Sequence, residues 1–136
     1  MSHLFLDRGN GRLALYMHGD LQFDAADESL YHAALGAAAD LASARRPGRR
    51  LRALILGGGD GLAARELLRR EAVGSIDLIE RDAAVLALGR GELSELNGRA
   101  FADPRLAVHN LDAREALPRA RGYDIIIYDL TYPDDA

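Results

Sequence analysis

The sequence predicts an α/β fold with a mainly parallel sheet of about four strands, preceded by a small antiparallel β-meander. From Leu51 onward, apolar runs alternate with segments of helical periodicity, which is the pattern of βαβ units. The glycine-rich stretch at 57–61 follows the first apolar run and precedes a helical segment, as in nucleotide-binding α/β proteins. Three short apolar segments before residue 24 are separated by turn sequences, which favours a meander.

The individual elements follow from apolar periodicity and from turn residues. Asp24 is a candidate N-cap for the first helix, which the sequence RRPG ends. Right-handed crossovers place the strand that follows the glycine loop in the middle of the sheet. The expected strands are 4–6, 13–17, 21–23, 51–56, 75–80, 105–109 and 123–129, and the expected helices are 25–43, 61–71, 82–97, with a break near 89–91, and 113–117.

Composition limits the class of protein. A length of 136 residues predicts one compact unit, which we divide into the meander at 1–24 and a helix with a Rossmann-like nucleoside-binding domain at 25–136. No apolar run approaches the roughly 20 residues that cross a bilayer, and the N-terminal sequence has no export signal. The absence of cysteine excludes disulfides and thiolate metal sites, and we expect a cytoplasmic protein. The net charge of −4 argues against a nucleic-acid partner.

Four carboxylates follow the predicted strands, each near a strand's C-terminal end. They are Asp60, Glu80, Asp112 and Asp129. These ends form one rim of the crevice in which open α/β sheets bind ligands. Each acid alone is more often a helix cap than a ligand contact, but the set together with the glycine turn indicates a binding site. Asp60 would repel a phosphate, so the expected ligand is cationic.

Spacing suggests how this rim would hold a nucleoside. Glu80 follows Gly61 by about 19 residues, the separation at which a carboxylate accepts hydrogen bonds from ribose hydroxyls. Asp112 and Ala113 lie where an adenine edge would lie, although Asp112 could equally be the N-cap of the short helix that follows. The four histidines show no ligand spacing, so we expect no metal site.

The stretches LILGGGDGLAARELL, IDLIERDAAV, LNGRAFADPRLAVHNLDAREAL and YDIIIYDLTYP resemble successive motifs of the spermidine synthase family of aminopropyltransferases. The segment GDLQFDAADESLYHAAL resembles the part of the family that precedes them. The LNG and DPR stretch is similar in particular to the soluble domain of larger bacterial members. The resemblance implies a class I methyltransferase-like sheet, decarboxylated S-adenosylmethionine as aminopropyl donor, and a diamine or polyamine as acceptor.

The resemblance also implies roles for individual residues. Asp60 would attract the ammonium of the decarboxylated donor and repel the carboxylate of ordinary S-adenosylmethionine. Asp129 would be the catalytic carboxylate that binds the acceptor amine. The remaining expected positions are Gln22, His32, Gly57, Gly59, Glu80, Asp112 and Ala113 for the donor, and Tyr31, Asp129 and Tyr132 for the acceptor.

The sequence departs from the family in two ways, which leave other functions open. Tyr132 stands where the family has a second aspartate, and the chain is shorter than family members, as if truncated after the fourth strand of the sheet. That strand would be an uncovered apolar edge, so we expect a homodimer through it or through the meander, which light scattering can test. The alternatives are a catalytically silent relative that binds a nucleoside or polyamine, and an S-adenosylmethionine-dependent methyltransferase.

Overall fold

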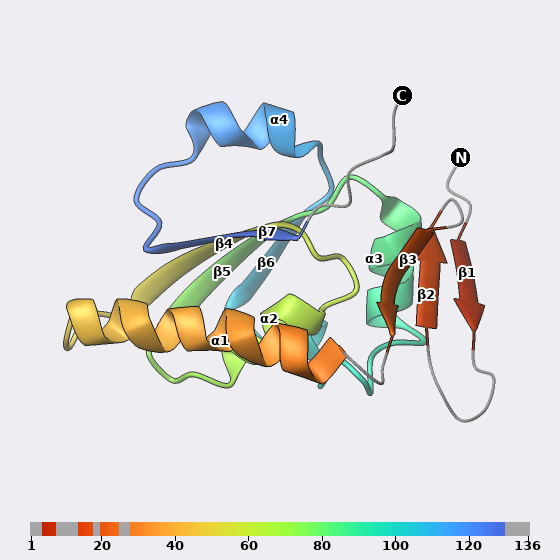
Figure 1. Cartoon of the computed structure of the whole chain (residues 1–136). Helices are drawn as coiled ribbons and strands as arrows, with labels where there is room; N and C mark the ends of the chain where they lie inside the picture. Colours follow the sequence, from red (N-terminus) through yellow and green to blue (C-terminus); the bar gives the residue numbers. More distant parts are fainter. Residues whose placement is uncertain (1–3, 8–13, 18–19, 25–27, 130–136) are drawn as a thin grey trace.

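Two β-sheets form the framework of the computed structural model, which describes residues 4–7, 14–17, 20–24 and 28–129 (Figure 1). The first sheet is antiparallel, with the order β1-β2-β3, and comprises β1 (Leu4–Asp7), β2 (Ala14–Met17) and β3 (Asp20–Asp24). The second sheet is parallel, with the order β6-β5-β4-β7. The predicted fold class, a meander followed by a mainly parallel four-stranded sheet, is confirmed.

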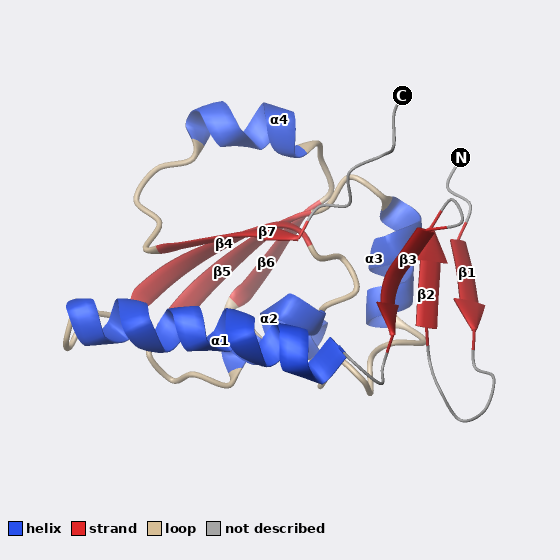
Figure 2. Ribbon diagram, viewed as in Figure 1, coloured by secondary structure: helices blue, strands red, loops and turns tan. Residues whose placement is uncertain are grey.

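Helices cover both faces of the parallel sheet (Figure 2). Helices α1 and α2 lie together on one face, and the short helix α4 lies over the other. The strands of this sheet are β4 (Leu51–Gly57), β5 (Val73–Ile79), β6 (Leu106–His109) and β7 (Ile125–Asp129). The helices are α1 (Glu28–Arg45), α2 (Leu62–Leu68), α3 (Ala83–Arg90) and α4 (Ala113–Ala116), with short 3₁₀ turns η2 (Ala100–Ala102) and η3 (Leu117–Arg119).

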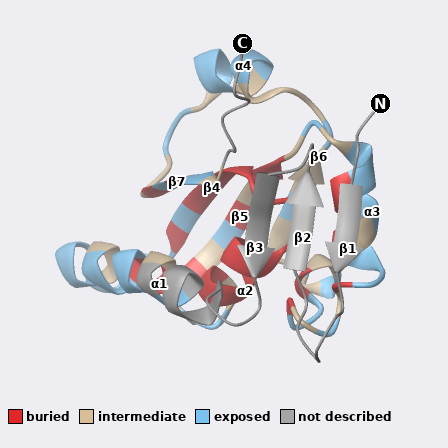
Figure 3. Ribbon diagram, turned by 45° about the vertical axis from the view of Figure 1, so that its right-hand side comes forward, coloured by how far each residue is buried: buried red, intermediate tan, exposed pale blue. Residues whose placement is uncertain are grey.

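Strand β4 is buried on both faces, which explains its continuous apolar sequence. Ala53 and Ile55 join the core beneath α1 and α2, whereas Leu54 and Leu56 join a second cluster beneath α4. Figure 3 shows this burial concentrated in the inner strands and α2, while much of α4 is exposed. The strand that leads into the glycine loop is therefore held on both sides.

Parallel pairing brings the carboxyl ends of the strands to one edge. Leu56 of β4 pairs with Ile79 of β5, and Gly57 pairs with Asp129 of β7. Strand β5 lies between β6 and β4, so the predicted inner position of the strand after the glycine loop is confirmed. This register sets the residues that follow β4 beside those that follow β5 and beside the end of β7.

The boundaries differ from the sequence prediction at several ends. The break expected near 89–91 is confirmed, but the helix expected beyond it, as far as residue 97, is wrong. Helix α3 ends at Arg90, and Gly91 caps it with its backbone N–H bonded to the carbonyls of Ala87 and Leu88. The chain then runs through successive turns as far as residue 99. Strand β5 begins at Val73, two residues before the predicted start, and α2 ends at Leu68. The proposed division at residue 24 stays a prediction.

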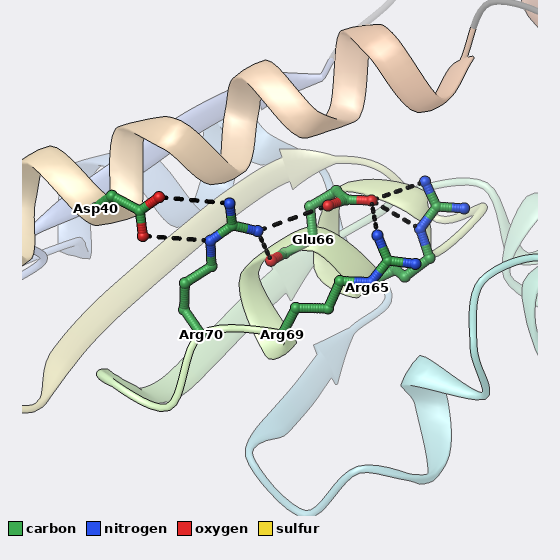
Figure 4. Close-up of polar contacts among 5 residues, drawn as sticks. All are labelled: Asp40, Arg65, Glu66, Arg69 and Arg70. Carbon is green, nitrogen blue, oxygen red and sulfur yellow. Dashed lines mark hydrogen bonds and ion pairs between the residues drawn. The ribbon is translucent and has the colours of Figure 1, made fainter.

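Helix α2 is tied to α1 by a chain of charged groups around Glu66 (Figure 4). The Glu66 side chain is only 3% exposed, and it accepts from Arg65 at 3.0 Å and from Arg69 at 2.8 Å. Arg70 lies 3.6 Å from the same carboxylate and also pairs with Asp40 of α1 at 3.4 Å. Because Arg65 is itself 8% exposed, Glu66 neutralises a cation that has little access to water.

We predict that Glu66→Ala lowers the free energy of unfolding by about 3 kcal/mol or more, because it removes the buried carboxylate that pairs with the Arg65 guanidinium at 2.9 Å. The control is Arg69→Ala, whose side chain is 61% exposed and whose loss should cost less than about 1 kcal/mol. Urea unfolding of both variants measures the difference. Equal losses would contradict a structural role for the buried pair.

Candidate nucleoside site

The loop between β4 and α2 has a backbone that only glycine adopts without strain. Gly58 has φ +74° and Gly61, the N-cap of α2, has φ +85°, both in the left-handed region. The N–H of Gly61 donates to the carbonyl of Gly58 at 2.9 Å, which closes a tight turn. The loop thus delivers the N-terminus of α2 directly to the carboxyl edge of the sheet.

Glu80, the first residue after β5, is bonded to this loop. Its Oε1 accepts from the N–H of Gly59 at 3.1 Å, and its Oε2 accepts from the N–H of Asp82 at 3.1 Å. A side chain on Gly59 would exclude this contact, because its Cβ would lie 2.6 Å from Glu80 Cγ. Both carboxylate oxygens are therefore oriented by backbone donors, and each retains a second lone pair for a ligand hydroxyl.

The pKa of Glu80 is raised above its ordinary value. Burial is the largest cause, and the negative charges of Asp82 and Asp60 act in the same direction. The N–H donors of Asp82 and Gly59 oppose the shift. The effect of Asp60 on this pKa shows that the carboxylates of these two predicted site residues interact electrostatically.

Asp60 lies at the N-terminus of α2. Its Oδ1 accepts from the N–H of Leu62 at 3.0 Å, so the side chain caps the helix from the residue before its N-cap. The positive end of the helix dipole stabilises a carboxylate at this position. The Asp60 carboxylate is therefore held at the glycine loop, close enough to Glu80 for its charge to raise the pKa of Glu80.

Asp129 ends β7 and reaches the same loop. Its partner in the parallel ladder is Gly57, and its Oδ2 lies 3.3 Å from the point where a side chain on Gly58 would begin. Gly58 thus makes room for the Asp129 carboxylate. The structure brings together three of the four predicted carboxylates, those of Asp60, Glu80 and Asp129, around residues 57–61.

Asp112 is the N-cap of α4, the alternative that the sequence left open. Its side chain accepts from the N–H of Arg114 at 2.8 Å and pairs with the Arg114 guanidinium at 3.0 Å. These bonds to Arg114 lower the pKa of Asp112 to about 2. Ala113 and Leu111 pack against the cluster of Leu54, Leu56 and Ile79, and Asn110 donates to the carbonyl of Glu80 at 2.9 Å, so this segment adjoins the edge that carries Glu80. The contact of Asp112 and Ala113 with an adenine stays a prediction.

Several predicted residues lie partly or wholly outside the described structure. The backbone of Gln22 belongs to β3, and Tyr31 and His32 belong to α1, but their side chains are outside the described part. Tyr132 is outside it altogether. Among the described residues, no group of three or more His, Cys, Asp or Glu side chains is arranged to hold a metal ion.

Sequence reasoning did not assign a role to Gly58 or Asp82. The run of three glycines was the available signal for Gly58, but its contact comes from Asp129, which is distant in sequence. Asp82 acts on Glu80 through its backbone N–H, which leaves no mark in the residue type.

Comparison with known proteins identifies relatives of this arrangement. A family model described as the spermine/spermidine synthase domain matches residues 26–135. Polyamine aminopropyltransferase 2 of Bacillus cereus is 44% identical over 125 residues, which are 90% of this chain and 32% of the relative. Polyamine aminopropyltransferase 1 of Streptomyces coelicolor is 42% identical over 131 residues, which are 94% of this chain and 24% of the relative. The chain thus spans between a quarter and a third of the length of these relatives.

Two solved structures of spermidine synthases are also similar to this chain. Spermidine synthase from Thermotoga maritima superposes with a TM-score of 0.84 at 25% identity, covering 98% of this chain and 45% of that chain. A spermidine synthase in complex with the transition state analogue AdoDATO superposes with a TM-score of 0.85 at 26% identity, with the same coverage.

Within the described residues, no helix is long and apolar enough to cross a membrane.

The raised pKa of Glu80 predicts how nucleoside affinity depends on pH. If Glu80 holds ribose hydroxyls, as the sequence predicts, affinity for 5′-methylthioadenosine should be full where Glu80 is ionised and should fall as the pH drops through the raised pKa of this group, because the protonated form accepts fewer hydrogen bonds. Calorimetric titration between pH 4 and pH 8 measures this midpoint. Asp112, with a pKa of about 2, stays ionised throughout that range.

The matched control is Glu80→Gln, titrated over the same range. It should bind the nucleoside more weakly at pH 7, and only the pH dependence of the adenine ring itself should remain. A wild-type profile that matches this variant would contradict a role for the Glu80 carboxylate.

Proposed function

The chain belongs to the spermine/spermidine synthase domain family, and from this membership we propose that it acts in aminopropyl transfer from decarboxylated S-adenosylmethionine to a diamine or polyamine. The observation that carries the proposal is the group of carboxylates around the glycine loop. Asp60, Glu80 and Asp129 place negative charge at one edge of the sheet. The proposed donor carries positive charge on both its sulfonium and its amine, which this edge suits.

The nucleoside part of the donor is assigned to the edge formed by β4, β5 and α4. The Glu80 carboxylate would accept from the ribose hydroxyls, and its fixed orientation by Gly59 and Asp82 supports this role. Gly57 and Gly59 would contact the donor through their backbone atoms. Asp112 would accept from the exocyclic amine of adenine while Ala113 faces the ring. Gln22 and His32 would complete the donor site from β3 and α1.

Asp60 is assigned to the aminopropyl arm. A charge pair about 4 Å apart contributes roughly 4 kcal/mol at an effective dielectric constant near 20, before desolvation is subtracted. The carboxylate of ordinary S-adenosylmethionine would meet repulsion at the same place. This difference supports a preference for the decarboxylated donor over the substrate of a methyltransferase.

Asp129 is assigned to the reacting amine. An alkylammonium with a pKa near 10.4 has no lone pair at neutral pH, so it must lose a proton before it can attack. Asp129 would bind this ammonium and accept or relay the proton. The amine nitrogen then forms a bond to the propyl carbon, the carbon–sulfur bond breaks with its electron pair moving to sulfur, and 5′-methylthioadenosine leaves. Tyr31 and Tyr132 would help to place the acceptor.

The assembly of the protein belongs to this proposal as well. Strand β7 is one of the two outer strands of the described parallel sheet, and Ile126 and Tyr128 on it are 49% and 61% exposed. This uncovered apolar surface agrees with the expected edge, and the homodimer through this edge or through the meander stays a prediction.

We predict that the purified chain, incubated with decarboxylated S-adenosylmethionine and a panel of amines, forms 5′-methylthioadenosine, and that Asp129→Asn reduces the rate at least about 100-fold. The reason is that the amide cannot accept the proton of the acceptor. Chromatography of the nucleoside product measures the rate. A wild-type chain that binds the donor but forms no product with any amine would replace the proposal with the catalytically silent relative.

We predict that Asp60→Asn reduces the preference for decarboxylated over ordinary S-adenosylmethionine by about tenfold or more. The asparagine oxygen can still accept from the N–H of Leu62, so the substitution removes the charge but keeps the cap. Calorimetry with both ligands measures the two dissociation constants. Equal or tighter binding of the carboxylated ligand by the wild-type chain would instead favour a methyltransferase.

A further inference from the structure

The glycine loop rests on a buried side chain that neither the charge pattern nor the proposed reaction uses. Asn97 lies in the turns that follow α3 and is 0% exposed. Its sequence neighbours form the LNG stretch, to which no role was assigned. A fully buried amide must find hydrogen-bond partners within the protein, so its contacts indicate what it holds in place.

The Asn97 amide joins three separate segments. Its Nδ2 donates to the carbonyl of Asp60 at 3.0 Å and to the carbonyl of Gly89 in α3 at 2.7 Å. Its Oδ1 accepts from the N–H of Ala100 at 3.2 Å. Both donor hydrogens and one acceptor position are used, so the side chain has a single orientation.

The peptide group between Asp60 and Gly61 is held from two sides. Its carbonyl accepts from Asn97, and its N–H donates to the carbonyl of Gly58 at 2.9 Å. Fixing this peptide group fixes the direction in which the Asp60 side chain leaves the backbone. The Asp60 side chain in turn accepts from the N–H of Leu62 at 3.0 Å.

Close packing leaves the loop no room to shift toward α3. A Cβ on Gly61 would lie 2.6 Å from Asn97 Nδ2, and a Cβ on Gly89 would lie 2.3 Å from the carbonyl oxygen of Gly59. Phe101 fills the remaining space, 2.9 Å and 2.6 Å from the same two Cβ positions. The loop is therefore seated on α3 and on Asn97.

We propose that Asn97 is a positioning residue for donor recognition, acting through the Asp60 peptide group to aim the Asp60 carboxylate at the aminopropyl arm. The role at the ligand rests on the proposed function, whereas the role in holding the loop is a property of the free protein. The two can therefore be tested separately.

Arg105 provides a matched control. Its guanidinium donates to the carbonyls of Leu68 at 2.7 Å, Val73 at 3.0 Å and Arg70 at 3.3 Å. These are contacts of the same kind, a side chain that holds backbone carbonyls, but they lie at the amino end of β5. Loss of Arg105 should affect stability without reaching the glycine loop.

The first experiment compares amide hydrogen exchange in Asn97→Leu, Arg105→Leu and the wild-type chain without ligand. Asn97→Leu should speed exchange at the N–H groups of Gly59 and Leu62 at least about tenfold more than at Ile55 in β4. Arg105→Leu should change these amides no more than Ile55. Equal acceleration of all three amides by Asn97→Leu would overturn the local role, and Asn97→Asp, of the same size, replaces it if the leucine variant does not fold.

The second experiment measures binding of two nucleosides by the same variants. Asn97→Leu should weaken decarboxylated S-adenosylmethionine by about tenfold and 5′-methylthioadenosine by less than about threefold, because only the former has an ammonium for Asp60. Equal losses for the two ligands would overturn the link to Asp60. A wild-type chain that binds neither ligand would overturn the proposed function instead, while hydrogen exchange still decides the role of Asn97 in the loop.

Discussion

The hydrogen bond from the N–H of Gly59 to Glu80 sets the geometry on which the candidate site depends. It joins the loop after β4 to the residue after β5 at 3.1 Å, and it exists because Gly59 has no side chain to collide with Glu80. The parallel pairing of β4 with β5 brings the two segments to the same edge. Asp60 belongs to the same loop, and Asp129 reaches it from the end of β7.

This arrangement concentrates negative charge, and the protein stabilises each carboxylate by a different means. Glu80 has two backbone donors, Asp60 has the N-terminus of α2, and Asp112 has Arg114. The pKa of Glu80 is raised because burial outweighs its donors, whereas Arg114 lowers the pKa of Asp112. A bound cation would reduce that cost, whereas a phosphate would increase it. The electrostatics of the candidate site therefore favour a cationic ligand over an anionic one.

The sequence predicted the parts of this site that depend on position along a strand. The apolar run of β4 and the acids at the ends of β5 and β7 were identified because strand ends converge in a parallel sheet. It predicted the break near residues 89–91, where α3 ends, but not that turns rather than a second helical stretch follow, since apolar residues such as Leu93 and Leu96 continue the helical spacing. Nor could it assign Asn97, because hydrogen bonds to backbone carbonyls leave no trace in the residues that supply them.

A glycine-rich loop is usually interpreted as space for a ligand, but here the protein's own contacts already require the glycines. Side chains on Gly59, Gly61 and Gly89 would collide with Glu80, with Asn97 and with the loop carbonyl, respectively. The same pattern would therefore be needed whatever the loop binds. It follows that the glycines indicate how the loop is built, and that the class of ligand has to be inferred from the carboxylates that the loop brings together.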